Sequence, residues 1–211
     1  MDVVAQTVET YDKIAAEYCK KTRRPHLLQW EENYIKRLLF HIDEPIPLVL
    51  DVGCADGRHC VMIDKNSGRA IGIDLSRTML TEAKSFYPGG RFCHMDMRRL
   101  AFADGFFGGI WMSGCIYHVP KAGAKSVVEE FARALKLDGV LAVNFKLGTG
   151  EGLEQNPRSF AGFPRYFAYY GKEEMRELFE RCGFQELETC GFPEEIFGDR
   201  IQQMWLRLRT K

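Results

Sequence analysis

Three aspartates follow or end apolar segments, a placement that suits a shared binding site. Asp51 stands in the run LVLDV, Asp74 ends the run AIGID, and Asp96 follows the run RFCHM. An ionised carboxylate only accepts hydrogen bonds, so these side chains suit the hydroxyl, amino or cationic groups of a ligand. If the three runs are neighbouring parallel strands, their carboxyl ends meet at one edge of the sheet, where such sheets bind ligands.

The turn that follows the first run adds a second constraint on the ligand. Its small residues are Gly53, Ala55 and Gly57, and Arg58 stands where a dinucleotide-binding turn needs its last glycine. A pyrophosphate requires that close approach to the start of the following helix. The spacing therefore favours a ligand without phosphates lying across the turn. A turn that only joins a strand to a helix is the alternative.

Together these residues predict the parts of one ligand. Asp74 can accept hydrogen bonds from both hydroxyls of a ribose, and Leu75 can cover one face of a base. Asp96 can accept from an exocyclic amine, while Met97 offers a backbone N–H and an apolar side chain. Asp51 could receive a cationic group. Adenosine with a cationic, amino-acid-like tail meets these requirements, and S-adenosylmethionine is such a molecule.

The residues around these motifs alternate between strand and helix patterns. Strands are predicted at 48–52, 70–74, 91–95, 108–114, 140–145, 184–190 and 203–209, and helices at 5–19, 30–42, 56–65, 77–87, 121–136 and 173–184. Ser76 could cap the fourth helix, and the turn LDG should end the fifth. The alternation predicts an α/β fold with a Rossmann-like, doubly wound seven-stranded sheet, mostly parallel with one antiparallel strand near the C-terminus.

The predicted organisation is a single domain over residues 1–211. Residues 1–44 form an N-terminal helical cap in this interpretation, and 147–171 form a substrate lid or loop. In the last strand, Trp205 and Arg207 alternate with Leu206 and Leu208, which predicts a half-exposed strand.

Composition narrows the class of protein. The 211 residues contain 29 Lys plus Arg and 29 Asp plus Glu, so the formal net charge is +0, and no global attraction to nucleic acid is implied. The seven cysteines include no CxxC pair, which predicts reduced thiols and no metal site. No signal peptide and no membrane-spanning run is recognisable, so a cytoplasmic protein with no membrane partner is expected, as a monomer or homodimer.

Four segments in order resemble the class I S-adenosylmethionine-dependent methyltransferases, in the small type 11 group. They are VLDVGCADG, GIDLSRTML, DMRRLAFADGFFGGIWMSGCIYHV and ARALKLDGVLAVNF. The segment YDKIAAEY, residues 11–18, resembles the N-terminal helix that covers the cofactor in this group. The resemblance spans about residues 10–190.

This resemblance implies S-adenosyl-L-methionine as cofactor, with S-adenosyl-L-homocysteine as product. Ser113 would lie near the methionine carboxylate or the sulfonium. Ala55 replaces the glycine that is usual in the family, which is tolerable if its backbone φ is negative. The residues expected to bind the cofactor are Asp51, Gly53, Cys54, Ala55, Gly57, Asp74, Leu75, Asp96, Met97 and Ser113.

Methyl transfer needs a base only when the acceptor must lose a proton. His118 is the first candidate, and Tyr117 is the second unless it points into the core. The segment MSGCIYH lacks the Asn/Asp-Pro-Pro-Tyr sequence that resembles amino-group methylation of bases or glutamine, so that acceptor class is disfavoured. The residues expected to bind substrate are Tyr11, Tyr18, Arg165, Tyr166 and Tyr169, although tyrosines at the helical spacing of Tyr11 and Tyr18 are more often core residues.

We expect a small-molecule acceptor, and three alternatives stay open. A tRNA-modifying enzyme of the wobble-uridine type would use the basic stretch KKTRR with Arg98 and Arg99 to bind phosphates. A methyltransferase-like module could bind the nucleoside without chemistry. An NAD-dependent oxidoreductase is the third alternative, and Arg58 argues against it.

Overall fold

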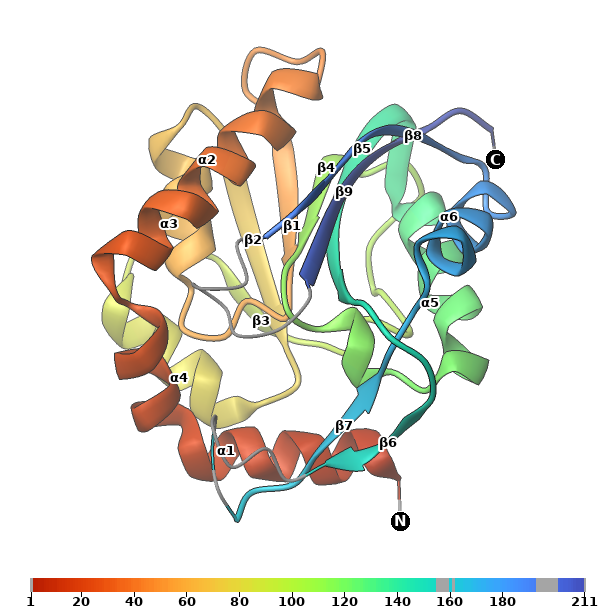
Figure 1. The fold of residues 1–211 in the computed structure, drawn as a ribbon. Coiled ribbons are helices and arrows are strands. Elements are labelled where there is room, and N and C mark those ends of the chain that lie inside the picture. The colour runs from red at the N-terminus through yellow and green to blue at the C-terminus, as the bar shows by residue number, and fades with distance from the viewer. Residues whose placement is uncertain (1, 155–159, 161, 193–200, 211) are drawn as a thin grey trace.

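The computed structural model describes residues 2–154, 160, 162–192 and 201–210, and its centre is a seven-stranded sheet (Figure 1). The strand order is β3-β2-β1-β4-β5-β9-β8. The first five strands in this order are parallel, and β9 is antiparallel to both β5 and β8. This confirms the predicted fold class. The strands are β1 Leu48–Val52, β2 Arg69–Asp74, β3 Phe92–His94, β4 Phe107–Met112, β5 Leu135–Lys146, β8 Phe184–Gly191 and β9 Ile201–Leu208.

Helices cover both faces of the sheet, as a parallel sheet requires. Buried side chains of α2 (Pro25–His41) and α3 (Arg58–Lys65) pack in one hydrophobic cluster, and those of α5 (Lys121–Ala134) and α6 (Lys172–Glu180) pack in another. Helix α1 (Val3–Thr22) lies across the end of the sheet and contacts α4 (Arg77–Phe86) (Figure 1). The predicted N-terminal cap, residues 1–44, thus contains two helices with different positions.

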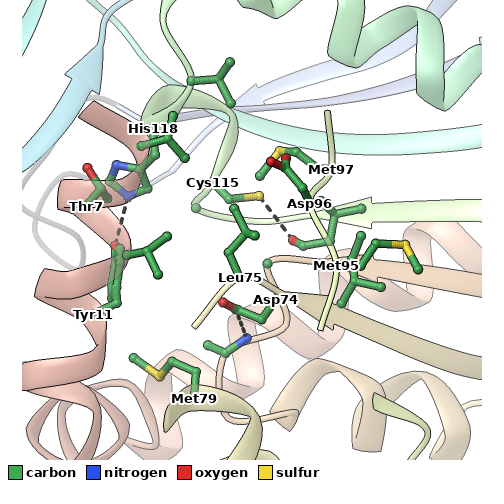
Figure 2. Close-up of a pocket in the computed structure, with 18 of the residues that line it drawn as sticks. Thr7, Tyr11, Asp74, Leu75, Met79, Met95, Asp96, Met97, Cys115 and His118 are labelled. Carbon is green, nitrogen blue, oxygen red and sulfur yellow. Dashed lines mark hydrogen bonds between the residues drawn. The ribbon is translucent and has the colours of Figure 1, made fainter. Parts of the chain in front are cut away.

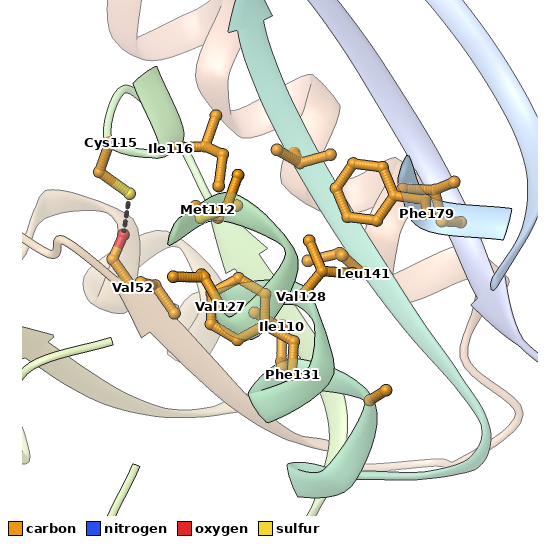
Figure 3. Packing of buried hydrophobic residues seen from close by; sticks show 14 of the residues in the cluster. Val52, Ile110, Met112, Cys115, Ile116, Val127, Val128, Phe131, Leu141 and Phe179 are labelled. Atoms are coloured by element: carbon orange, nitrogen blue, oxygen red, sulfur yellow. Dashed lines mark hydrogen bonds between the residues drawn. The ribbon is translucent and has the colours of Figure 1, made fainter. Parts of the chain in front are cut away.

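The larger core joins the central strands to α5 and α6. Figure 3 shows Ile110 and Met112 of β4 and Leu141 of β5 against Val127, Val128 and Phe131 of α5, with Phe179 of α6 beside them. Strands β1 and β4 are buried on both faces, which explains why they are continuous apolar runs without alternation. The core holds the carboxyl ends of these strands in place, and the polar residues of the candidate site come directly after those ends.

Local sequence signals set where the helices begin. Oγ of Ser76 accepts a hydrogen bond from the backbone N–H of Met79 at 3.0 Å, so Ser76 caps α4 as predicted. Pro25 occupies the first turn of α2, where its missing N–H costs nothing. Helix α3 follows Gly57, which has a left-handed φ of 74°.

Two expectations about the elements differ from the structure, and a third feature lies elsewhere than expected. Strand β9 is buried rather than half-exposed, because it lies between β5 and β8, and Trp205 is 1% exposed. Strand β5 begins at Leu135 directly after α5, but its pairing with β4 skips residues 136–139 and Asp138 has a φ of 63°, so the predicted LDG turn lies inside β5. The expected loop 147–171 contains an antiparallel pair, β6 (Glu151–Glu154) and β7 (Arg165–Ala168). No helix within the described residues is long and apolar enough to cross a membrane.

Candidate functional site

A cavity opens at the carboxyl ends of β1, β2 and β4, and α1 covers it (Figure 2). We call it the cofactor cavity. It brings together seven of the ten residues expected to bind a cofactor, which are Gly53, Ala55, Asp74, Leu75, Asp96, Met97 and Ser113. Sequence reasoning missed side chains that α1, α4 and the segments after β3 and β4 add, namely Val4, Thr7, Val8, Met79, Met95, Cys115 and Val119.

The turn after β1 is shaped by backbone requirements. The N–H groups of Gly53 and Cys54 both donate to the carbonyl of Ile73, each at 2.9 Å, and this fixes the turn against β2. A side chain at Gly53 would place its Cβ 2.9 Å from Cβ of Cys115, so this position has room only for glycine. The turn therefore exposes backbone to the cavity.

Ala55 departs from expectation, because its φ is +46° rather than negative. An L-residue with a side chain is strained in the left-handed region, by about 1–2 kcal/mol. Its backbone N–H donates to Oδ2 of Asp74 at 2.9 Å, which holds the residue in this conformation. The backbone at Ala55 is therefore strained, and the extra methyl group is accommodated at that cost.

Asp74 is anchored and still has capacity to bind a ligand. Its Oδ2 accepts from the N–H of Ala55, and its Oδ1 accepts from the N–H of Ser76 at 2.8 Å. A carboxylate has about four lone-pair sites, so two remain. Burial raises the pKa of Asp74 to about 6, against the lowering effect of the hydrogen bonds from Ser76 and Ala55.

Asp96 and Met97 reach the cavity from the segment after β3. The carboxylate of Asp96 also accepts from the backbone N–H of Arg98 at 2.9 Å and from the Arg98 guanidinium at 2.7 Å. Asp96 thus caps this turn and also lines the cavity. Apolar walls surround this part of the cavity, supplied by Leu75, Met79, Met95 and Met97.

Three expected cofactor residues do not line the cavity. Asp51 is fully buried on the side of β1 that packs against α3, where its Oδ2 accepts from Sγ of Cys60 at 3.3 Å. Asp51 thus does not line the cavity, because side chains alternate along the strand and this one points toward α3. Cys54 is buried against the sheet, and a side chain at Gly57 would meet Phe92 at 2.6 Å, so both serve packing.

His118 lines the cavity in a fixed tautomer. Its Nδ1 lies 2.6 Å from the carbonyl oxygen of Tyr166, which only accepts, so Nδ1 carries the proton. Its Nε2 therefore accepts from the hydroxyl of Tyr11 at 2.9 Å (Figure 2). The guanidinium of Arg165 donates to the Tyr11 oxygen at 3.2 Å. Burial, together with the charges of Arg165 and Lys146, lowers the pKa of His118 to about 3.

The residues expected to bind substrate fall into two groups. Tyr11 and Tyr18 line the cofactor cavity, and Arg165 lies behind Tyr11. Tyr166 and Tyr169 instead donate from their hydroxyls to Glu151 and Glu154, at 2.5 and 2.7 Å, and so join β7 to β6. Those two tyrosines hold the hairpin together and line neither cavity.

A second cavity adjoins the first and shares Tyr18, Ser113 and Gly114 with it. Sequence reasoning found only Tyr117 among its other residues, which are Thr22, Leu27, Glu31, Tyr34, Arg58, Trp111, Asn144, Phe192 and Ile201. Asn144 lies near the carboxyl end of the apolar strand β5, and a polar residue at that position could have been predicted to line a binding site. Among residues 2–154, 160, 162–192 and 201–210, no group of three or more His, Cys, Asp or Glu could hold a metal ion.

Ionic contacts join the helical cap to the turn after β1. Arg58 donates to both carboxylate oxygens of Glu31, each at 3.0 Å, and to Asp56 at 3.1 Å. Arg23 pairs with the other oxygen of Asp56 at 2.6 Å. Burial by itself would raise the pKa of Glu31, but Arg58 and His59 outweigh it and hold that pKa well below its usual range.

Residues 49–139 match a family model described as "Methyltransferase domain". The fold is similar to that of 1,6-didemethyltoxoflavin-N1-methyltransferase from Burkholderia thailandensis, whose structure contains 1,6-didemethyltoxoflavin and S-adenosylhomocysteine. The TM-score is 0.77 at 17% sequence identity, and the match covers 98% of this chain and 88% of that one. A methyltransferase of Haloferax volcanii, in complex with the Trm112 methyltransferase activator, has a TM-score of 0.74 at 19% identity, covering 97% and 98%.

A Methanosarcina mazei structure, titled as SAM-dependent methyltransferases, has a TM-score of 0.71 at 15% identity, covering 82% of this chain and 98% of that one. No curated protein matches the chain in sequence. At these identities the structures show the shared fold, while the family model covers the strands and turns that build the cofactor cavity. The chain therefore has the fold of S-adenosylmethionine-dependent methyltransferases, and its residues 49–139 match the methyltransferase domain family.

Proposed function

We propose that this methyltransferase acts on a small-molecule acceptor by in-line displacement. S-adenosylmethionine, when bound, supplies a methyl group already activated on a positively charged sulfur. The chain's own contribution is then to bind the donor, align the acceptor with it, and exclude water. Alignment of this kind can lower a barrier by about 7–11 kcal/mol.

The residues of the cofactor cavity fit the donor. The spare lone pairs of Asp74 suit two ribose hydroxyls, and Asp96 with Met97 suits the amino edge of adenine. Leu75, Met79 and Met95 supply apolar faces for a flat base. The backbone of Gly53 and the hydroxyl of Ser113 are left to contact the methionine end of the donor. Asp51, which was expected to contact this end, does not line the cavity. The free lone pairs of a half-buried, anchored Asp74 are the observation that carries this assignment.

His118 has a defined part in the proposal. Its Nε2 holds the Tyr11 hydroxyl, so the group presented to the cavity is the phenolic oxygen of Tyr11. A histidine whose pKa is about 3 stays neutral at physiological pH and is a weak proton acceptor. We therefore assign His118 to the positioning of Tyr11, and we favour acceptors that need no strong base in the transfer step.

A small acceptor agrees better with the charges than RNA does. Three cations considered for a phosphate patch are paired with carboxylates: Lys21 with Glu17, Arg23 with Asp56, and Arg98 with Asp96. Phosphate binding would have to compete with these pairs. The small molecule bound in the Burkholderia structure supports the same choice of acceptor. The complex of the Haloferax protein with the Trm112 activator separately suggests that this chain could have a protein partner.

The test is calorimetry with S-adenosylmethionine, S-adenosylhomocysteine and NAD, followed by a screen of metabolites with methyl-labelled donor. We expect both sulfur nucleosides to bind, NAD to fail, and label to move to a small molecule. Failure of both nucleosides to bind would refute the donor assignment. RNA that binds and takes up label would refute the acceptor class.

A further inference from the structure

Asn144 links the ends of two neighbouring strands through its side-chain amide. Its Oδ1 accepts from the backbone N–H of Gly114 at 2.7 Å, and its Nδ2 donates to Oγ of Ser113 at 2.8 Å. The two amide atoms can be told apart, because a backbone N–H only donates and the atom beside Gly114 must therefore be the oxygen. Asn144 is 5% exposed, so water competes little for these two bonds, and they hold the amide in one orientation.

Ser113 and Asn144 lie on the face of the sheet that carries the second cavity. Trp111 and Ala142 are register partners on β4 and β5, and both belong to the hydrophobic cluster beneath α2 and α3. Side chains alternate along a strand, so Ser113 and Asn144, each two positions further along the chain, continue on that face. Both residues line the second cavity, and Ser113 also lines the cofactor cavity. Ser113 therefore lies where the two cavities meet.

The hydrogen bond from Asn144 decides what the Ser113 hydroxyl can offer a ligand. A hydroxyl has one proton and two lone pairs. One lone pair accepts from Asn144, and the proton has no acceptor among the residues that the structure describes. A ligand atom that accepts a hydrogen bond would satisfy it. If residue 144 were itself an acceptor, it would take this proton, and Ser113 could no longer donate to a ligand.

We propose that Asn144 is a positioning residue that keeps the Ser113 hydroxyl free to donate to the carboxylate of the S-adenosylmethionine tail. The inference rests on the proposed function, in which Ser113 contacts the methionine end of the donor. That end carries a sulfonium, an ammonium and a carboxylate, and only the carboxylate accepts hydrogen bonds. A hydroxyl bonded to a charged acceptor is held more strongly than one bonded to a neutral acceptor. Asn144 acts through Ser113 and not by its own contact with the donor.

Two ligands separate the carboxylate from the rest of the tail. S-adenosylhomocysteine carries it, and decarboxylated S-adenosylhomocysteine keeps the adenosine, the sulfur and the amine. In calorimetry on the full chain, Ser113→Ala should weaken binding of S-adenosylhomocysteine about ten- to a hundredfold, because a bond to a charged group is lost. It should weaken binding of the decarboxylated ligand less than about twofold. A cavity that was merely distorted would bind both ligands less tightly.

Asn144→Asp nearly keeps the shape of the side chain but replaces the donating Nδ2 with an accepting oxygen. The variant can still accept from Gly114, and it captures the Ser113 proton, so S-adenosylhomocysteine should bind at least about tenfold more weakly. The new charge also repels the ligand carboxylate, so the same change is made in the Ser113→Ala protein, where only the repulsion remains. There the fold-change should be at least about threefold smaller.

Asn66→Asp is the matched control for the change in charge. Asn66 caps the end of α3 and lines neither cavity. The same replacement there should alter the affinity for S-adenosylhomocysteine less than about twofold.

Asn144→Ala covers the case in which Asn144→Asp fails to fold. It removes the bond that orients the hydroxyl and adds no charge. Binding of S-adenosylhomocysteine should weaken about three- to tenfold in the otherwise native protein and less than about twofold in Ser113→Ala. Equal fold-changes in the two backgrounds would overturn the inference, as would an equal loss of both ligands in Ser113→Ala. Failure of the native protein to bind S-adenosylhomocysteine would instead count against the proposed function.

Discussion

The hydroxyl of Tyr11 lies 2.9 Å from Nε2 of His118, and this contact joins α1 to the segment after β4. The other ring nitrogen of His118 donates to the carbonyl of Tyr166, so the imidazole is held between two elements that are far apart in the sequence. Together the two contacts settle which nitrogen carries the proton, and both Tyr11 and His118 line the cofactor cavity. Because both ring nitrogens are engaged in the buried neutral form, protonation of His118 should change the stability of the fold.

We expect His118 to stay neutral down to about pH 3 in the folded protein. The unfolded chain binds a proton near pH 6.5, so between these values the unfolded state holds more protons and stability rises with pH. The contribution is lost as pH falls, by up to about 1.4 kcal/mol per pH unit. Denaturant melts from pH 4 to 7 should show a smaller slope for His118→Asn, and a His118 resonance that titrates near 6.5 in the folded protein would contradict the expectation.

Asp74→Asn should weaken S-adenosylhomocysteine binding by about 1.5–3 kcal/mol, because an amide replaces a charged hydrogen-bond acceptor. Asp51→Asn is the matched control, since Asp51 is a buried aspartate near the same turn but points toward α3. Calorimetry should show a change of less than about 0.5 kcal/mol for Asp51→Asn. Equal losses in the two variants would mean that Asp74 acts only through the fold.

Binding of the nucleoside should weaken as pH falls below about 6, the raised pKa of Asp74. Protonation removes the charge that favours two hydroxyl donors, so affinity depends on the ionised form. Titrations at pH 5, 6 and 7 in the native protein should show this trend, and Asp74→Asn should show a flat profile. A native profile that is equally flat would place the ribose elsewhere.

Ala55→Gly should stabilise the protein by about 0.5–1 kcal/mol, because glycine removes the left-handed strain at a smaller entropic cost. The control is Ala5→Gly in α1, an exposed helical position where the same change should cost up to about 1 kcal/mol. Chemical denaturation of both variants measures the difference. Destabilisation of similar size at both sites would show that Ala55 is unstrained.

Glu31→Gln should destabilise the protein by about 3–5 kcal/mol, since it leaves the buried guanidinium of Arg58 without its main partner. Glu32→Gln, one residue further along α2, breaks an exposed pair with Lys36 and leaves an oxygen that can still accept from Asn66, so it should cost less than about 1 kcal/mol. Thermal melts compare the two directly. A small effect at Glu31 would show that Asp56 alone can compensate Arg58.

The sequence by itself determined the fold and much of the cofactor cavity. Buried parallel strands must be continuous apolar runs, and the residues that follow them must meet at one edge, so Gly53, Asp74, Asp96 and Ser113 could be assigned to one site from pattern alone. The glycine spacing likewise argued against a dinucleotide. These inferences depend only on order along the chain and on strand period.

The tertiary structure decided what depends on side-chain direction and on distant contacts. It turned Asp51 toward α3, gave Ala55 a positive φ, and placed β9 between two other strands. It also joined Tyr11 to His118 across 107 positions and gathered Trp111, Asn144 and Arg58 around a second cavity. The physical reason is that strand period fixes alternation but not which face meets which helix, and packing between elements settles that choice only in the folded chain.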